Sequence, residues 1–324
     1  MTETMRHASR RRGPARTGLV LMAFLLCAGL PSAQGPAVRL NGAIDKLQRG
    51  LPVVGAIMYD FSLYAARQFA TSDLDYIILD MEHQALDFER LQTFFLGMTD
   101  KAAIARQGHL QIRVPPLVRI PTYGRDLNEF IVKQVLDLGA FGIMYPAVDT
   151  REQALHAVRA ARYPPRRGAP NAEPIGIRGN GNVPGAWFWG LSRAEYSQRA
   201  DAWPVNPQGE LLLLIQIETA EGVRNIEEIV TVPGIGVIFI GPNDLAYSLG
   251  VADGSPEHEA AIQTVLGSCL AHDVPCAITV DAADVAQRLK EGFKMVSLGS
   301  GGLESQMDAA LRAARAAIPQ APIP

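Results

Sequence analysis

The sequence predicts a (β/α)₈ barrel, and three observations lead to that fold. Short apolar runs rich in Ile, Leu and Val recur along the chain, as expected of strands buried in a parallel sheet. Most runs are followed by a helical pattern, and eight strands alternating with eight helices over about 290 residues is the count for such a barrel. The competing doubly wound sheet would need a glycine-rich turn after the first strand, and residues 58–61 do not form one.

The expected strands and helices alternate along the chain. The strands are Val53–Met58, Tyr76–Leu79, Leu117–Ile120, Gly142–Tyr145, Leu211–Ile217, Gly236–Ile240, Cys276–Val280 and Met295–Leu298. The helices are Leu63–Ala70, Phe88–Met98, Leu127–Leu138, Arg151–Arg162, Glu221–Val230, Glu257–His272, Ala282–Lys290 and Leu303–Ala317. A short amphipathic helix over residues 39–49 precedes the first strand. One long irregular stretch, Tyr163–Gly190, interrupts the order, and such loops are typical of functional or subunit-contact segments.

The N-terminal 35 residues differ from the rest of the chain. A cluster of arginines precedes the apolar run Gly18–Leu30, and small residues follow it. That order is typical of an export signal peptide, by a Sec or a twin-arginine route. The run is short for a membrane span, so we expect no stable span after processing, with a retained anchor as the alternative. The expected division is 1–35 export signal, 36–318 single barrel domain and 319–324 disordered tail, with a periplasmic location.

The composition narrows the class of partner. The chain has 324 residues, 48% of them hydrophobic, and a formal net charge of −3. It is long enough to bury a large core, and its mildly acidic body argues against nucleic acid as a partner. Cys269 and Cys276 are expected to be buried thiols, with a disulfide as the alternative.

Two carboxylates follow successive predicted strands. Glu218 and Asp244 lie 26 residues apart, one strand–helix–strand repeat. They are therefore expected at the same end of two strands, and neighbouring strands lie about 4.8 Å apart. One divalent cation could contact both side chains, with Mg²⁺ or Mn²⁺ favoured by these hard oxygen ligands and Co²⁺ as a further choice. In the alternative, each carboxylate only caps the helix or turn that follows it.

Other polar residues follow strands at the same predicted rim. Gln216 faces the same side of its strand as Glu218 and could hydrogen-bond a ligand. The fork of Arg119 could grip an oxygen anion or stabilise an enolate, unless it serves only a rim ion pair. His83 could move a proton near neutral pH, unless it only caps or packs.

Together these residues predict carbon–carbon bond cleavage or formation. A 2-oxo acid such as pyruvate could bind the cation through its carboxylate and keto oxygens, while Arg119 stabilises the enolate and His83 moves a proton at the aldehyde oxygen. Backbone N–H groups of Gly241 and Asn243, beside Asp244, could receive a carboxylate. A Schiff-base lysine is the alternative, but Lys133 and Lys294 are not placed at the rim.

Seven ordered motifs resemble a known family. They are Asp80-Met81-Glu82-His83, Val118-Arg119-Ile120-Pro121, Lys133 to Ala140, Arg162-Tyr163-Pro164-Pro165, Gly176-Ile177-Arg178-Gly179, Gln216-Ile217-Glu218-Thr219 and Phe239 to Leu245. The stretch from about residue 50 to 305 is similar to the metal-dependent 2-oxo-acid aldolases of the HpcH/HpaI type. These include 4-hydroxy-2-oxoheptanedioate and 2-keto-3-deoxy-sugar-acid aldolases.

The resemblance implies a phosphoenolpyruvate/pyruvate-type TIM barrel and a hexamer in which the last helix packs on a neighbouring subunit. It implies Glu218 and Asp244 as metal ligands and Arg119 as the pyruvate and enolate clamp, with Gln216 beside the substrate. It also implies His83 as acid/base, paired with Asp137, which the pattern alone would place as an ordinary helix-end residue.

The chain departs from the family pattern in four respects. It carries the export segment, lacks the family's tryptophan near Ile57 and Met58, and is longer over residues 121–129 and 166–175. Two other functions remain open. One is a citryl- or malyl-CoA-lyase-like enzyme, with Arg166, Arg167 and Arg178 as candidates for a CoA cradle. The other is a non-catalytic exported binder of oxo acids, which would need no proton shuttle.

Overall fold

The computed structural model describes residues 38–299 and 303–317, which belong to one compact unit. The expected export segment (1–35) and tail (319–324) lie outside the described residues. Within the described part, no helix is long and apolar enough to cross a membrane. Cys269 and Cys276 are buried free thiols, as expected.

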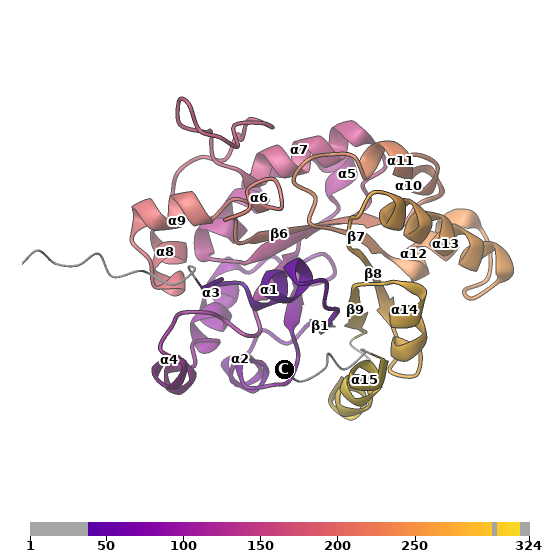
Figure 1. Cartoon of the computed structure of the whole chain (residues 1–324), viewed down its shortest axis with the longest axis horizontal. Coiled ribbons are helices and arrows are strands. Elements are labelled where there is room, and N and C mark those ends of the chain that lie inside the picture. The colour runs from indigo at the N-terminus through magenta and orange to yellow at the C-terminus, as the bar shows by residue number, and fades with distance from the viewer. Residues whose placement is uncertain (1–37, 300–302, 318–324) are drawn as a thin grey trace, which may run out of the picture. The chain divides into compact units, whose positions relative to one another are not determined.

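Eight parallel strands form a closed ring (Figure 1). They are β1 Val53–Met58, β2 Tyr76–Asp80, β3 Pro116–Arg119, β4 Gly142–Tyr145, β6 Leu211–Ile217, β7 Val237–Ile240, β8 Cys276–Val280 and β9 Met295–Leu298. Pairing of β1 with β9 and of β4 with β6 closes the ring. The two-residue strand β5, Ala202–Trp203, adds to the edge of β6. The predicted (β/α)₈ barrel is therefore confirmed.

Helices surround the ring, and more of them are present than the periodicity predicted (Figure 1). They are α1 Gly42–Gln48, α2 Leu63–Ala70, α3 Phe88–Gly97, α4 Lys101–Gln107, α5 Tyr123–Asp126, α6 Glu129–Leu138, α7 Arg151–Ala161, α8 Val183–Trp189, α9 Arg193–Arg199, α10 Ala220–Arg224, α11 Ile226–Ile229, α12 Pro242–Leu249, α13 Pro256–Ala271, α14 Val285–Glu291 and α15 Leu303–Ala317. The predicted single helix over 221–230 is wrong: it breaks at Asn225, whose side chain donates to the Asp149 carbonyl at 2.8 Å. The stretch 163–190 is not wholly irregular, because it contains α8.

The barrel interior is filled by side chains. Gly55 pairs with Tyr76, and a Cβ at Gly55 would lie 2.5 Å from the tyrosine ring. The absent side chain admits the ring, whose hydroxyl lies 2.7 Å from the Val296 carbonyl and 2.6 Å from Ser297 Oγ. The interior is therefore a packed core, and a substrate can reach only the ends of the strands.

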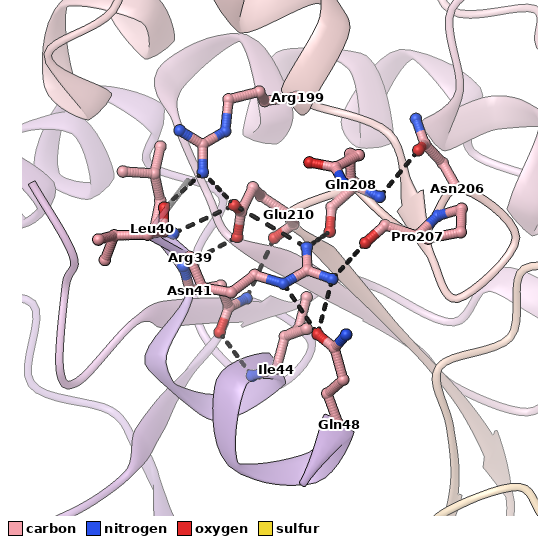
Figure 2. Close-up of polar contacts among 12 residues, drawn as sticks. Arg39, Leu40, Asn41, Ile44, Gln48, Arg199, Asn206, Pro207, Gln208 and Glu210 are labelled. Carbon is pink, nitrogen blue, oxygen red and sulfur yellow. Dashed lines mark hydrogen bonds and ion pairs between the residues drawn. The ribbon is translucent and has the colours of Figure 1, made fainter. Parts of the chain in front are cut away.

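The end of the barrel where the strands begin is closed by a set of paired polar groups (Figure 2). The buried Glu210 carboxylate accepts the backbone N–H groups of Leu40 at 3.1 Å and Asn41 at 3.0 Å. It also forms ion pairs with Arg199 and Arg39. The Asn41 side chain caps α1 and donates to two backbone carbonyls of the barrel. These bonds fix α1 against this end.

Candidate active site

Asp80, the last residue of β2, organises the opposite rim of the barrel. Its carboxylate is fully buried and accepts the backbone N–H groups of Glu82 at 2.9 Å and His83 at 3.4 Å. It also receives both arms of Arg119, Nε at 3.1 Å and Nη2 at 2.5 Å. One carboxylate therefore shapes the turn after β2 and fixes the guanidinium on β3.

Arg119 lies at the mouth of the barrel between two carboxylates. Its side chain is 9% exposed, and Nε lies 3.4 Å from Glu82 Oε2 in addition to its bonds with Asp80. Burial alone would lower the pKa of Arg119, but the hydrogen bond and charge of Asp80, with the charge of Glu82, raise it above its ordinary value. Arg119 therefore does form ion pairs at the rim, as the alternative supposed. These ion pairs keep the guanidinium charged and fix its orientation at the mouth.

Glu218 follows β6 and is nearly fully buried. Its Oε1 accepts the backbone N–H of Ala147 at 2.8 Å, and its Oε2 contacts the side-chain amide of Gln216. Ala147 has a φ of 52°, the left-handed region that is costly for alanine, and this conformation directs its N–H toward the carboxylate. Helix α10 is capped by Thr219 and not by Glu218, so the alternative of a capping role for Glu218 is wrong.

The pKa of Glu218 is raised to about 8, chiefly by burial. The charges of Glu82 and Asp244 add to the increase, and the Ala147 N–H and the charge of Arg119 oppose it. Burial likewise raises the pKa of Glu82. The charges of Asp80 and Asp244 also raise it, whereas those of Arg119 and His83 lower it. Glu218 and Asp244 are thus close enough to repel each other. Their strands, β6 and β7, are neighbours, as predicted.

Gly241 joins these two strands at the rim. A Cβ at this position would lie 2.6 Å from Glu218 Oε2 and 2.7 Å from Gln216 Nε2, so only glycine leaves room for the carboxylate. Gly241 precedes α12, in whose first turn Asn243 and Asp244 lie exposed. The helix N-terminus therefore opens beside the carboxylates.

A divalent cation fits this set of residues. The carboxylates of Asp80, Glu82, Glu218 and the exposed Asp244 lie near one principal cation, Arg119. The pKa values of the two acids Glu82 and Glu218 are raised, and further positive charge would relieve this crowding. The Gln216 Oε1 atom is buried without a hydrogen-bond partner among the described residues. No group of three His, Cys, Asp or Glu side chains that could hold a metal occurs in residues 38–299 and 303–317. Two carboxylates with several waters are nevertheless an ordinary site for Mg²⁺.

The structure does not bring His83 and Asp137 together within one chain. His83 lies at the mouth with its side chain 55% exposed and its Nε2 3.6 Å from Glu82 Oε2. Asp137 lies near the end of α6, just before β4 begins, and therefore at the other end of the barrel. There it forms ion pairs with Lys133 and with Arg178, whose Nη2 is 2.9 Å away. Asp137 is part of a buried ionic cluster in the single chain.

The longer segment 121–129 forms α5 and supports the carboxylate site. The backbone N–H groups of Tyr123 and Gly124 donate to the Pro146 carbonyl at 3.2 and 3.1 Å. A Cβ at Gly124 would lie 1.6 Å from the Ala147 carbonyl oxygen, so the two turns touch. Helix α5 therefore holds the backbone that donates to Glu218.

Three residues that shape this site were not among the predicted site residues, although the first two lie in a quoted motif: Asp80, Glu82 and Ala147. Asp80 could have been found, because it alternates with Tyr76 and Ile78 on the inner face of its strand and ends it. Ala147 acts through its backbone conformation, and the presence of alanine in the sequence does not reveal that conformation.

The family model described as HpcH/HpaI aldolase/citrate lyase matches residues 60–306. The chain belongs to this family. It is 34% identical over 256 residues to the 2-keto-3-deoxy-L-rhamnonate aldolase of Klebsiella pneumoniae, covering 78% of this chain and 84% of that protein. It is 32% identical over 267 residues to the enzyme of the same name from Escherichia coli K12, covering 81% and 88%.

Solved structures of family members share this fold. An HpcH/HpaI aldolase/citrate lyase family protein from Burkholderia cenocepacia has a TM-score of 0.67 at 29% identity, covering 86% of this chain and 97% of that one. The HpcH/HpaI aldolase of Desulfitobacterium hafniense has a TM-score of 0.64 at 26% identity over the same shares. The predictions of a phosphoenolpyruvate/pyruvate-type barrel and of a class II aldolase, a carbon–carbon lyase, are confirmed.

Proposed function

We propose that this aldolase reversibly cleaves a 4-hydroxy-2-oxo acid to pyruvate and an aldehyde at the mouth described above. Glu218 and Asp244 would hold a divalent cation, Mg²⁺ or Mn²⁺ or alternatively Co²⁺. The observation that carries the proposal is the crowding of carboxylates around one guanidinium, with the pKa of Glu218 raised to about 8. A site built this way is completed by a cation.

The bound cation supplies Lewis acidity that lowers the energy of an enolate. Arg119 adds a second positive charge, and its position is fixed in advance because Asp80 holds both of its arms. Preorganised donors of this kind stabilise charge that develops in the transition state without paying for reorganisation.

Proton transfer falls to His83. A base removes the proton from the C4 hydroxyl, the C3–C4 bond breaks to release the aldehyde, and the electron pair passes to the pyruvate enolate, which is then protonated at C3. His83 is exposed at the mouth, and its Nε2 lies 3.6 Å from Glu82 Oε2, a carboxylate that can steady the protonated ring. The N-terminus of α12 at Gly241 and Asn243 is the place for the substrate carboxylate.

The decisive experiment measures pyruvate release from several 4-hydroxy-2-oxo acids and metal-dependent exchange of the pyruvate methyl protons with D₂O. Both activities are expected with Mg²⁺ or Mn²⁺ and are expected to stop with a chelator. Glu218→Gln should abolish both. Glu221→Gln, at an exposed carboxylate on the following helix, is the matched control and should change neither. Exchange that persists in Glu218→Gln would overturn the proposal.

The CoA-lyase alternative loses one of its three arginines. Arg178 is 2% exposed and bonded to Asp137, so it is not available to a CoA phosphate. The non-catalytic alternative predicts binding of pyruvate without methyl proton exchange, so the same experiment separates it from the aldolase.

We also propose a periplasmic homo-oligomer, a hexamer by family resemblance. Residues 1–35 support export by their order of basic, apolar and small segments. Large exposed apolar side chains support a subunit contact, among them Phe130 at 59% and Tyr247 at 86% exposure. Light scattering of the purified protein and fractionation of the expressing cell test the two points separately.

A further inference from the structure

The chain contains the dipeptide Asn-Gly twice, at Asn41-Gly42 and at Asn180-Gly181. In this dipeptide the backbone nitrogen of glycine can attack the side-chain amide of asparagine, because glycine has no Cβ that would hinder the approach. A five-membered succinimide forms as ammonia leaves, and water then opens the ring to give a carboxylate. The two copies share the same chemistry, so any difference between their rates must come from the fold.

The fold restrains the reacting groups at Asn41. This side chain is fully buried, and its amide nitrogen donates to the backbone carbonyls of Phe141 at 3.2 Å and Glu210 at 3.1 Å. Its Oδ1 accepts two backbone N–H groups of helix α1, and the Gly42 N–H donates to the Ile112 carbonyl at 3.1 Å. The reaction at Asn41 therefore requires local opening of the structure.

Asn180 and Gly181 have none of these restraints. Both residues are exposed and lie outside helices and strands, in the segment that leads to the start of α8 at Val183. Within the part of the chain that the structure describes, neither the Asn180 side chain nor the Gly181 N–H has a hydrogen-bond partner. Such a segment changes conformation at little cost, so the side chain can reach the geometry of attack.

A lysine lies against this dipeptide. Lys133 Nζ is 2.9 Å from the position that a Cβ of Gly181 would occupy, and Lys133 Cε is 3.1 Å from the corresponding position at Gly179. The lysine side chain therefore contacts the backbone on both sides of Asn180. Its positive charge favours the deprotonated Gly181 nitrogen that attacks, and also the oxyanion that forms at the amide carbonyl.

The charges around this lysine are compatible with the product. Lys133 and Arg178 are two cations, and both pair with the carboxylate of Asp137. A further carboxylate at position 180 would give this cluster two charges of each sign. Because nearby opposite charges favour the ionised form of an acid, the product carboxylate would be accommodated in the folded protein.

We propose that Asn180 is a modification site, at which the folded protein converts asparagine to aspartate and isoaspartate without an enzyme. The Gly181 nitrogen forms a bond to the Asn180 Cγ, and the bond from Cγ to the side-chain nitrogen breaks. The Gly181 N–H proton passes to solvent, ammonia leaves, and water opens the succinimide at either carbonyl. No oxidation or reduction occurs, and water is the only co-reactant. The inference goes beyond the proposed function and does not depend on it.

The test follows both dipeptides in one sample of folded protein that is kept at mildly alkaline pH. Deamidation raises the mass of a peptide by about 1 Da, and trypsin separates the two sites into peptides 40–46 and 179–193. Fragmentation assigns the change to Asn180 and not to Asn182. We expect the rate at Asn180 to exceed that at Asn41 by about tenfold or more. In urea, where the fold is lost, the two rates should become similar.

Two lysine variants test the part assigned to the neighbouring charge. Lys133→Met removes the charge at similar length and should slow the reaction at Asn180 by about threefold or more. Lys101→Met, at an exposed lysine on α4, is the matched control and should change neither rate. Asn180→Asp, which copies one product, should keep Tm within about 2 °C of the wild-type value.

Equal rates at the two sites in the folded protein, or a faster rate at Asn41, would overturn the inference. A rate at Asn180 that Lys133→Met leaves unchanged would overturn the part assigned to Lys133. A large decrease in the Tm of Asn180→Asp would overturn the accommodation of the product.

Discussion

The two ends of the barrel treat buried charge in opposite ways. Where the strands begin, Glu210 has two arginines and two backbone N–H groups (Figure 2), and Asp137 lies between Lys133 and Arg178. Where the strands end, Glu82 and Glu218 have raised pKa values because they are buried and lie near other carboxylates, and Arg119 is the principal cation near them.

This difference separates stability from function. A buried carboxylate with every lone pair satisfied contributes to a fixed fold, and removing its partners is costly. Carboxylates held close together against their repulsion either take up a proton or bind a cation, and raised pKa values of this kind are typical of functional sites. Buried acids lie at both ends, Glu210 and Asp137 where the strands begin and Asp80 and Glu218 where they end, so burial alone would not distinguish the two ends.

The largest expected effect comes from Arg119, the principal cation of the rim among the residues that the structure describes. Arg119→Lys keeps a positive charge beside Asp80. It loses the planar guanidinium, whose donors can bind Asp80 and a substrate oxygen at the same time. We expect kcat for pyruvate release to fall about a hundredfold to a thousandfold, or ~3–4 kcal/mol of transition-state stabilisation. Thermal unfolding should change little, which excludes a folding defect. A variant with wild-type kcat would show that the fork is not used.

The next largest effect is expected from a substitution at the opposite end of the barrel, where the strands begin. Glu210→Ala leaves the buried N–H groups of Leu40 and Asn41 without an acceptor. We expect the free energy of unfolding to fall by about 3 kcal/mol, because Arg199 and Arg39 retain some access to water. Urea denaturation measures the loss, and Glu210→Gln, which keeps one acceptor, should lose less. The folded Glu210→Ala protein should retain its kcat, since the rim is untouched.

The pH dependence of stability sharpens the comparison. The pKa of Glu218 lies at about 8 in the folded metal-free protein against an ordinary value of 4.5, so the folded state holds an extra proton between these values. The free energy of unfolding should therefore decrease as pH rises from about 4.5 to about 8, by at most ~1.4 kcal/mol per unit, and level off above.

A divalent cation should reverse this trend, because it needs the ionised carboxylate and displaces the proton. The increase in Tm on adding Mn²⁺ should be larger at pH 8 than at pH 6. In the Glu218→Gln variant, the free energy of unfolding should not decrease between pH 4.5 and 8, and Mn²⁺ should not increase the Tm more at pH 8 than at pH 6. A metal-free stability that rises from pH 5 to pH 8 would contradict the assignment of the raised pKa.

The smallest effect concerns the support beneath the rim. The Tyr123 hydroxyl lies 2.7 Å from His156 Nδ1, and His156 Nε2 lies 2.7 Å from Glu129. Tyr123→Phe should reduce the free energy of unfolding by about 1 kcal/mol, since one hydrogen bond is lost at constant ring packing. Activity should fall only a few-fold, through a looser Ala147 turn. Unchanged stability would mean that this chain of bonds does not hold α5.

The fold was predictable because the strands are apolar throughout and short. β1, β4, β6, β8 and β9 begin and end at the predicted residues. The helices were less predictable where propensity conflicts with local contacts, as at Asn225, or where a segment is too short for periodicity, as in α5 and α8.

The site was predictable where chemistry follows a strand end. Glu218, Asp244, Arg119, Gln216 and Gly241 converge as their positions indicated. The pairing of Asp137 with His83 was not found in the single chain, because a helix that leaves one end of a barrel ends at the other. The Ala147 N–H was not predictable, because its direction depends on a backbone conformation and on the contact with Gly124.

The close approach at Gly241 has a consequence for how enzymes on this scaffold could diverge. With a carboxylate oxygen 2.6 Å from where a methyl group would stand, position 241 between β7 and α12 tolerates no side chain while Glu218 keeps its place. Selection for a new substrate, in nature or in the laboratory, should therefore retain glycine at this position for as long as Glu218 is retained.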